Sequence, residues 1–533
     1  MFLFHTIPYV RNQNDFNIAD QYGAWVGHQD LIRAVLKYGS LEGIHFFLPF
    51  QRHSQEELAR GLEELRRDFP TQRIETRRLI DLQELAKEYR YVLADDFEMF
   101  TSLALSRHVD GQCLFPLCNI VHTIPQYTAL MGYLSTMLLA EPFDAIVATS
   151  EAANNAIKSI FEELTEFVRS RWKIKIPRVI KPTRIPMGID DEFLRPYDSK
   201  AARSTLNLPS DTINILYLGR LSEGFKADLE PLLTVFSRLA VEDSNLRLVV
   251  AGQDVQNKYS SNLRSLAEQF GIGEQLIIRT NFPFSQKPLF YSACDIFVSP
   301  VDNIQETFGL SILEAMACGL PVIASDWSGY RDLVVHGETG FLVSTIWNGA
   351  ATRLAELAAP LRNSTTAGHY LAQQTVVDGE ELLKYLRLLL DNPDLRKQFG
   401  EKGRERVAAR FSWPVVVKQY EEVWREQWLQ LDRIDRRTEL HLPLNYNKQF
   451  GHFATRFLDG EVVLKASAHR SSDSAFSIGD NGLPYAVKLE DIQQVISQCQ
   501  VRPRSISELS ASGNSSILNA ATWLWKKGYL ETV

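Results

Sequence analysis

The sequence predicts an α/β protein with two Rossmann-like domains, followed by a small α+β appendage. Short apolar runs alternate with amphipathic segments of helical length, which is typical of parallel βαβ units. A turn-forming segment that contains Pro186 and Gly188 divides this alternating region. The length of 533 residues suits several domains, because domains typically contain about 100–200 residues. We therefore assign residues 1–195 to a first domain, 196–432 to a second domain and 433–533 to a tail.

The first domain is expected to begin with a β-rich run and then alternate strands with helices. A plausible capping box, with Ser54 as N-cap and Glu57 three residues later, starts its second helix. Strands are expected at Phe2–Ile7, Ile44–Leu48, Tyr91–Leu93, Asn119–His122 and Asp144–Ala148, and helices at His28–Tyr38, Ser54–Phe69 and from Glu151 to about Arg171.

The second domain repeats the alternation. Its first strand, Asn214–Arg220, is largely apolar, as expected for a parallel strand buried on both faces. Residues 344–378 interrupt the pattern, and 363–368 is interpreted as a loop. Further strands are expected at Leu246–Ala251, Leu276–Arg279, Asp295–Val298 and Pro321–Ala324, with helices at Asp228–Ala240, Gly379–Asp391, Pro393–Arg410 and from Trp413 to about Leu431.

Composition excludes several classes of function. The net charge of −8 means that the surface as a whole does not attract nucleic acid or anionic membranes. The five cysteines are scattered, and Cys113 with Cys118 lacks a second pair of ligands nearby, so a zinc site is not expected. No basic lead-in for a signal peptide and no apolar run of about 20 residues are found, so we expect a cytoplasmic protein.

The stretch from Asn303 to Val343 carries the strongest signal for function. Glu306 lies in a loop, and Glu314 lies about one turn into the following helix, with seven residues between them. The helix N-terminus favours a phosphate, and Gly309 has no Cβ to block a ligand's approach. Carboxylates beside it can accept hydrogen bonds from hydroxyls. This pattern indicates a nucleotide-sugar pocket.

Two structural alternatives compete with that interpretation. Ser311 and Glu314 have the spacing of a capping box, in which Glu314 would only satisfy a backbone N–H. Glu306 could equally be a solvated loop acid.

Three further residues lie where strands of the predicted sheets end. Arg220 and Lys226 follow the first strand of the second domain, and two cations at the mouth of a parallel sheet suit a diphosphate. The alternative is that both are solvated at the surface. His122 ends the strand PLCNIVH, where it could take part in chemistry or simply bond to a nearby carbonyl.

The stretch from Asn303 to Val343 resembles the signature of retaining glycosyltransferases of the GT-B type, family four. The resemblance covers roughly residues 1–432 and is strongest from Asn214 to Val343. It implies two domains facing each other across a cleft. It also implies that Glu306 contacts the transferred sugar, that Glu314 contacts the nucleotide ribose, and that the phosphates rest on the backbone after Glu306, at Phe308, Gly309 and Leu310.

The same resemblance extends to other segments. Arg184–Asp190 resembles the I-P-x-G-I/V-D motif at which the family's chain crosses between domains. Gly219, Arg220 and Lys226 resemble the family's phosphate-binding G-R-(x)n-K, which implies a reaction without a metal or other cofactor. The family's His after the corresponding strand implies that His122 lines the sugar pocket.

The first-domain phosphate contact departs from the family's pattern. The family usually carries a glycine pair in the long loop before the first helix, whereas this chain has only the separated Gly23 and Gly27. Gly27 is nearer to the helix start and is the candidate donor contact.

The tail is not needed for that fold. Its last part reads as helix, helix, helix and strand, which resembles a small winged-helix module. Four Lys/Arg against two acids between Val501 and Val533 is no clear nucleic-acid footprint, so contact with a protein or simple packing is preferred.

The resulting hypothesis is a metal-independent, retaining glycosyltransferase whose partners are a nucleoside-diphosphate sugar and an acceptor. His122, Glu306, Arg220 and Lys226 are its catalytic candidates. One alternative is a GT-B enzyme that is not a transferase, such as an epimerase or a phosphorylase. Another is a nucleotide-sugar-sensing regulator that acts through the tail.

Overall fold

The computed structural model describes residues 2–5, 23–48, 55–78, 89–94, 97–107, 115–122, 124–125, 127–174, 180–254, 258–361, 364–433, 446–455, 457–469, 487–510 and 515–533. The chain forms two compact units, residues 1–442 and 443–533. Among the described helices, none combines the length and the apolar composition that crossing a lipid bilayer requires. The predicted N-cap Ser54 and Cys113 lie outside the described residues.

The first part of the larger unit is built on a seven-stranded sheet in the order β3-β2-β1-β4-β5-β6-β7, whose neighbouring strands run parallel. Largely apolar runs form its central strands; β5 and β6 are buried along their whole length. The strands are β1 Phe2–His5, β2 Gly43–Leu48, β3 Arg73–Arg78, β4 Tyr89–Ala94, β5 Leu117–Val121, β6 Ala145–Ala148 and β7 Thr183–Arg184, and the helices are α1 Gly23–Tyr38, α2 Gln55–Asp68, α4 Phe97–Ser106, α5 Tyr127–Leu139 and α6 Glu151–Trp172.

The first helix and one edge strand differ from the sequence prediction, and helices α4 and α5 were not predicted. The first helix begins at Gly23, five residues before the expected His28, so Gly27 lies within a helix rather than in a loop. Strand β3, with the sequence RIETRR, was not predicted because its residues are mostly charged. It lies at the edge of the sheet, where polar side chains can remain in water.

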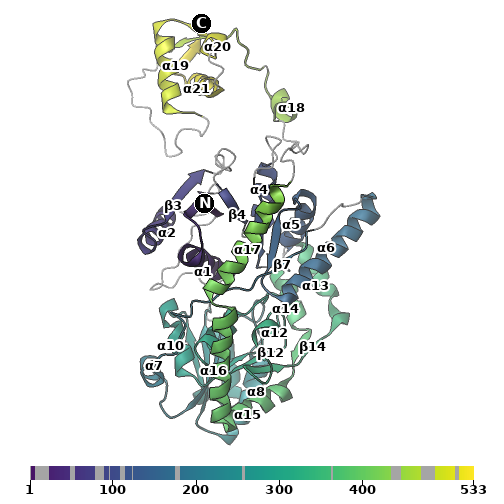
Figure 1. The fold of residues 1–533 in the computed structure, drawn as a ribbon. Coiled ribbons are helices and arrows are strands. Elements are labelled where there is room, and N and C mark those ends of the chain that lie inside the picture. Colours follow the sequence, from purple (N-terminus) through teal and green to yellow (C-terminus); the bar gives the residue numbers. More distant parts are fainter. Residues whose placement is uncertain are drawn as a thin grey trace. The chain divides into compact units, whose positions relative to one another are not determined.

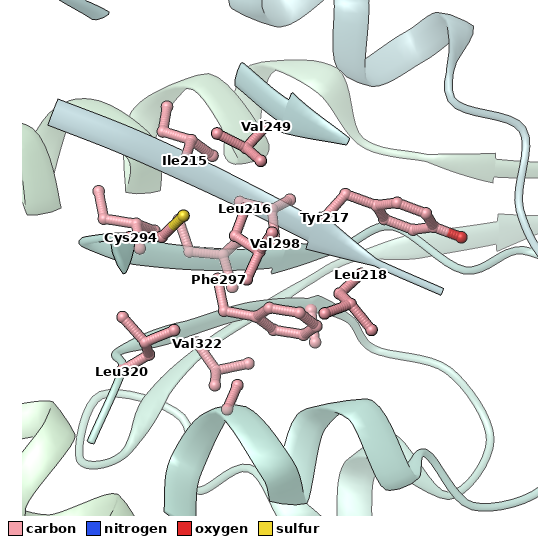
Figure 2. Close-up of a cluster of buried hydrophobic side chains, with 14 of the residues drawn as sticks. Ile215, Leu216, Tyr217, Leu218, Val249, Cys294, Phe297, Val298, Leu320 and Val322 are labelled. Carbon is pink, nitrogen blue, oxygen red and sulfur yellow. The ribbon is translucent and has the colours of Figure 1, made fainter. Parts of the chain in front are cut away.

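The second part is built on a six-stranded parallel sheet in the order β10-β9-β8-β11-β12-β13. Figure 2 shows side chains of its central strands, including Leu216, Val249 and Phe297, packed together in the core. The strands are β8 Ile213–Leu218, β9 Leu246–Gly252, β10 Leu276–Thr280, β11 Ile296–Ser299, β12 Val322–Ser325 and β13 Gly340–Val343, and the helices are α7 Ser199–Thr205, α8 Glu230–Glu242, α9 Lys258–Gln269, α10 Lys287–Ala293, α11 Leu310–Ala317, α12 Tyr330–Leu333, α15 Gly379–Asp391 and α16 Pro393–Arg410.

An insertion between β13 and α15 accounts for the interrupted pattern after residue 343. Strands β14 Thr345–Trp347 and β15 Thr375–Val377 pair antiparallel, and helices α13 Arg353–Ala358 and α14 Ser364–Ala372 lie between them in the sequence. The interpretation of 363–368 as a loop is therefore wrong for residues 364–368. A Cβ added to Gly368 would lie 3.5 Å from Asn303 Oδ1, so α14 packs on the loop that follows β11.

The chain crosses between the two sheets along paired segments. Ile189 N donates to Phe411 O over 2.8 Å, and a Cβ on Gly188 would lie 2.3 Å from the Trp413 ring. Helix α17, Trp413–Leu431, then packs on α1 of the first domain (Figure 1). Its Trp424 is fully buried in the core of that domain. The helix predicted to return to the first domain is therefore present.

The smaller unit has its own hydrophobic core. Helices α19 Leu489–Val501, α20 Ile506–Leu509 and α21 Ser515–Lys526 accompany a three-stranded antiparallel sheet, β17-β16-β18, made of Arg504–Ser505, Val463–Ala466 and Leu530–Thr532. Ser505 and Glu508 form a reciprocal capping box at the start of α20. The helices follow the predicted order, and the strand β16 precedes them.

Candidate functional site

The loop of residues 300–309 connects β11 to α11 and carries Glu306. Asn303 is fully buried and organises this loop: its side-chain amide donates to Gly224 O over 2.9 Å, and its backbone carbonyl accepts from Trp327 Nε1 and from Glu306 N. Gly224 belongs to the loop after β8, so this hydrogen bond holds together the two loops at the carboxyl ends of neighbouring strands. The sequence therefore brings the predicted cations and the predicted carboxylate into the same region.

Lys226 and Glu306 form a direct ion pair. The Lys226 ammonium contacts Glu306 Oε2, and the two side chains are only 20% and 11% exposed. The Glu306 carboxylate also accepts from Phe308 N over 3.4 Å, next to the start of α11. The alternative of a solvated loop acid is therefore wrong for Glu306, and the alternative of a solvated surface cation is wrong for Lys226.

Tyr330, which sequence reasoning missed, is hydrogen-bonded to Glu306. Its buried hydroxyl lies 2.8 Å from Ser299 Oγ and donates to Glu306 Oε2 over 3.4 Å. Burial and the neighbouring Glu306 carboxylate raise the pKa of Tyr330 well above its usual value, so the phenol remains a donor at neutral pH. Its ring packs on Gly309, where an added Cβ would approach Tyr330 Cε1 to 2.4 Å.

Gly309 is the N-cap of α11, with a φ of 113° and no side-chain capping bond. A positive φ is strained for any residue with a Cβ. Phe308 and Leu310 flank it; Phe308 is buried, and Leu310 is the first residue of α11. The positive φ and the neighbouring Tyr330 ring therefore each require glycine at this position, whether or not a ligand approaches it.

Glu314 is buried and held by two residues of α10. Its Oε1 accepts from Lys287 Nζ over 2.5 Å, and its Oε2 accepts from Tyr291 Oη over 2.6 Å. Ser311 lies inside α11 and does not cap it, so the capping-box alternative is wrong. Lys287 and Tyr291 are four positions apart and share one face of α10. That spacing does not by itself indicate Glu314, on another helix, as their partner.

Arg220 and Gly219 lie beside the Lys226–Glu306 ion pair. A Cβ on Gly219 would lie 3.4 Å from Lys226 Cε, so the Lys226 chain passes over this glycine. The Arg220 guanidinium lies 5.6 Å from the centre of the Phe225 ring, and Tyr217 Oη donates to Arg220 O over 3.3 Å. Both predicted cations thus leave the carboxyl end of β8.

Hydrogen bonds connect the Glu306 loop to the first sheet. Thr307 Oγ1 donates to His122 O over 3.1 Å, just after β5, and Ser150 Oγ donates to Thr307 O over 2.6 Å. Ser150 is also the N-cap of α6. Glu151 N donates to Asp332 Oδ2 over 2.7 Å, which adds a second connection between the sheets.

The predicted residues of the first domain lie close to this connection. The His122 ring packs edge-on against His28, with the ring centres 4.5 Å apart. Although part of the residue is accessible, Nε2 is buried, and burial together with His28 holds the pKa of His122 well below its usual value. Gly27 precedes His28, and its Cβ position would lie 1.7 Å from Met187 Cε, so it faces the crossing segment.

Asp302 was not predicted as part of the site. It is buried just before Asn303, and its Oδ1 has no hydrogen-bond partner in the described structure. Burial, with the nearby charge of Asp228 as a lesser cause, raises its pKa from 3.8 to about 7.

The geometry thus groups Gly219, Lys226, Glu306 and Gly309 closely. The loop of residues 300–309 is hydrogen-bonded to His122. Arg220 belongs to the same loop as Lys226, whereas Glu314 lies further along α11 and has its own partners. Within the described part of the chain, no group of three or more His, Cys, Asp or Glu side chains is arranged to hold a metal ion.

Comparison with known proteins bears on the same region. The sequence model of a family described as Glycosyl transferases group 1 matches residues 198–359. D-inositol 3-phosphate glycosyltransferase of Thermobispora bispora is 29% identical over 60% of this chain and 67% of its own length. The protein of that name from Stackebrandtia nassauensis is 30% identical over 48% of this chain and 58% of its own length. The matches thus span between 58% and 67% of these relatives.

The solved structures agree with the fold. HepE from Anabaena in complex with UDP has a TM-score of 0.55 and 16% identity, over 80% of this chain and 99% of its own length. This likeness shows the fold alone, and it confirms the predicted fold class of two Rossmann-like domains in the GT-B arrangement.

Proposed function

We propose that this chain, whose second domain matches group 1 glycosyl transferases, is a retaining glycosyltransferase that uses a nucleoside-diphosphate sugar without a metal ion. The observation that carries the proposal is the ion pair between Lys226 and Glu306 beside the start of α11. It places a cation and a hydroxyl-accepting carboxylate at a helix N-terminus, as an activated sugar requires.

Each group then has a role that follows from its charge. Lys226 and Arg220 bind the diphosphate and stabilise the negative charge that develops as it departs, which replaces the role of a divalent metal. The backbone at Gly309 and Leu310 receives the phosphates. Glu306 orients the sugar, and Glu314, held by Lys287 and Tyr291, accepts from the ribose.

Donor binding has to rearrange the Lys226–Glu306 pair. In the structure the two groups neutralise each other, and the donor offers a phosphate to the cation and hydroxyls to the carboxylate. Because the two side chains are mostly buried, removing one of them leaves the other uncompensated. Loss of either residue is therefore expected to disturb both halves of the donor contact.

The first domain supplies the acceptor side. Neutral His122 can contact the reacting sugar or the acceptor, since its low pKa keeps it uncharged at neutral pH. We assign no enzymatic nucleophile, because the stereochemistry is retained by front-face attack within an ion pair. D-inositol 3-phosphate, in the name of the relatives, is the first acceptor to test.

The test uses purified chain, a labelled donor and a chelator. A thermal-shift screen against UDP-, GDP- and ADP-sugars identifies the donor, because a bound ligand stabilises the folded state. UDP-sugars come first, since HepE was solved with UDP. Transfer in the presence of chelator with the product in the donor's anomeric configuration supports the proposal; inverted product or loss of activity with chelator refutes the corresponding part.

Variants locate the site. Glu306→Ala, Lys226→Ala and Arg220→Ala are expected to lose transfer while remaining folded, and Lys384→Ala, an exposed lysine on α15, serves as the control. Full transfer by any of the three counts against the assignment. Product analysis separates a transferase from an epimerase or a phosphorylase, and turnover of the donor separates an enzyme from a regulator.

A further inference from the structure

The end of α6 is a projecting surface that the proposed transfer reaction does not use. Val168 is the last buried residue of the helix, and every residue from 169 to 174 is exposed. Figure 1 shows this end of α6 extending beyond the neighbouring helices. Lys173 ends the helix in a left-handed conformation, with φ of 57°, and its N–H donates to Arg169 O. We call residues 167–174 the α6 tip.

Large apolar side chains lie exposed on the α6 tip. Phe167 is 51% exposed, and Trp172 and Ile174 are each 53% exposed. The rings of Phe167 and Trp172 pack edge-on, with centres 5.6 Å apart. Soluble proteins seldom expose such residues together, and clusters of this kind mark sites of interaction.

Cations lie beside these apolar residues in the sequence of the α6 tip. Arg169, Arg171 and Lys173 are exposed, and no acidic residue occurs between 167 and 174. Glu166 pairs with Arg169. Glu162 and Glu163 lie nine or ten positions before Trp172, about 13–15 Å back along the helix axis, which exceeds the Debye length of about 8 Å.

We propose that the α6 tip docks this protein onto an anionic lipid bilayer. Tryptophan and phenylalanine prefer the region of the lipid headgroups, and arginine and lysine beside them are attracted to anionic lipids. Ile174 favours a bilayer over single-stranded nucleic acid, because it offers no ring on which a base could stack. The net charge of −8 opposes general attraction to a bilayer, so the contact is confined to the α6 tip.

The expected binding is reversible and salt-dependent. Each cation near an anionic surface strengthens binding by about fivefold at low ionic strength. Reversing all three cations is therefore expected to weaken binding by at least a hundredfold. The apolar contribution is separate, so Trp172→Ala is expected to weaken binding at any salt concentration.

The test is flotation of the full chain with vesicles. One set contains phosphatidylcholine with phosphatidylglycerol, and the other contains phosphatidylcholine alone. The wild-type chain is expected to float with the anionic vesicles only. Arg169→Glu/Arg171→Glu/Lys173→Glu is expected to abolish flotation, and Trp172→Ala to reduce it, with unchanged melting temperatures.

A matched control carries the same change in charge elsewhere on the larger unit. Arg353 is 75% exposed and pairs with Glu356 three positions away, as Arg169 pairs with Glu166. The control variant is Arg353→Glu/Arg387→Glu/Lys397→Glu, and it is expected to float like the wild type.

Several results would overturn the docking proposal. These are absence of flotation by the wild type, or equal loss in the control variant. Another is a pattern in which the α6 tip variants still float with anionic vesicles but lose binding to a single-stranded oligonucleotide or lose self-association. Donor hydrolysis without vesicles is expected to be unchanged in these variants, so the outcome is independent of the proposed transfer activity.

Discussion

Asp302 gives a prediction whose size follows from its raised pKa. The carboxyl titrates at about 7 in the folded protein instead of 3.8, chiefly because of burial. A raised folded pKa means that the folded state holds the proton more tightly, so stability is lost as pH rises from about 4 to 7. A tenfold change in proton affinity between the folded and unfolded states corresponds to about 1.4 kcal/mol. The ionised carboxylate therefore costs up to about 4 kcal/mol above pH 7.

The variant Asp302→Asn removes this charge at every pH. Its amide N–H2 replaces an oxygen that has no partner and adds a cost of about 1–3 kcal/mol that does not vary with pH. The pH-dependent part of the change isolates the titration. The measured quantity is the unfolding free energy of Asp302→Asn minus that of the wild type. This difference is expected to rise by about 2–3 kcal/mol from pH 5 to pH 8.

The assay is urea denaturation of both proteins at pH 5 and pH 8. Asp211→Asn, which changes an exposed carboxylate, controls for net charge. The reasoning fails if the difference between Asp302→Asn and the wild type is the same at both pH values, or if it falls as pH rises.

Three further predictions concern the neighbouring contacts. Lys287→Met is expected to lower the free energy of unfolding by about 3–5 kcal/mol in urea denaturation, because buried Glu314 loses its cation, and adding Glu314→Gln is expected to restore most of it. Gly309→Ala is expected to cost more than about 2 kcal/mol in the same assay, because φ is 113° and the Tyr330 ring blocks the Cβ. Tyr330→Phe is expected to slow transfer roughly fivefold in steady-state kinetics without changing the binding of the nucleotide sugar, because the Glu306 carboxylate loses the hydrogen bond from the Tyr330 hydroxyl. An unchanged kcat refutes that role.

The central strands and the crossing segment could be predicted because local physics dictates them. An unbroken apolar run such as Ile215–Leu218 has to be buried on both faces, and the structure places β8 in the middle of the second sheet. Gly188 between Pro186 and the following strand-like residues predicts a turn, and the Trp413 ring occupies the space that a side chain would fill. These signals require no knowledge of distant contacts.

Residues of the site that depend on distant contacts could not be predicted. Tyr330 follows Glu306 by 24 positions, and its hydroxyl reaches that carboxylate only because β11 and β12 are neighbours. Lys287 precedes Glu314 by 27 positions and belongs to another helix. The capping-box spacing of Ser311 and Glu314 was misleading for the same reason, since α10 supplies stronger partners than the backbone does.

The position of Glu306 depends on both domains. Its carboxylate is held within the second domain by Lys226 and Tyr330, whereas the next residue, Thr307, is bonded to Ser150 and to the backbone of His122 in the first domain. Separating the domains would remove both of those hydrogen bonds from a single residue of the loop. The loop that carries Glu306 is therefore connected to the residue that follows β5, His122, through the single residue Thr307.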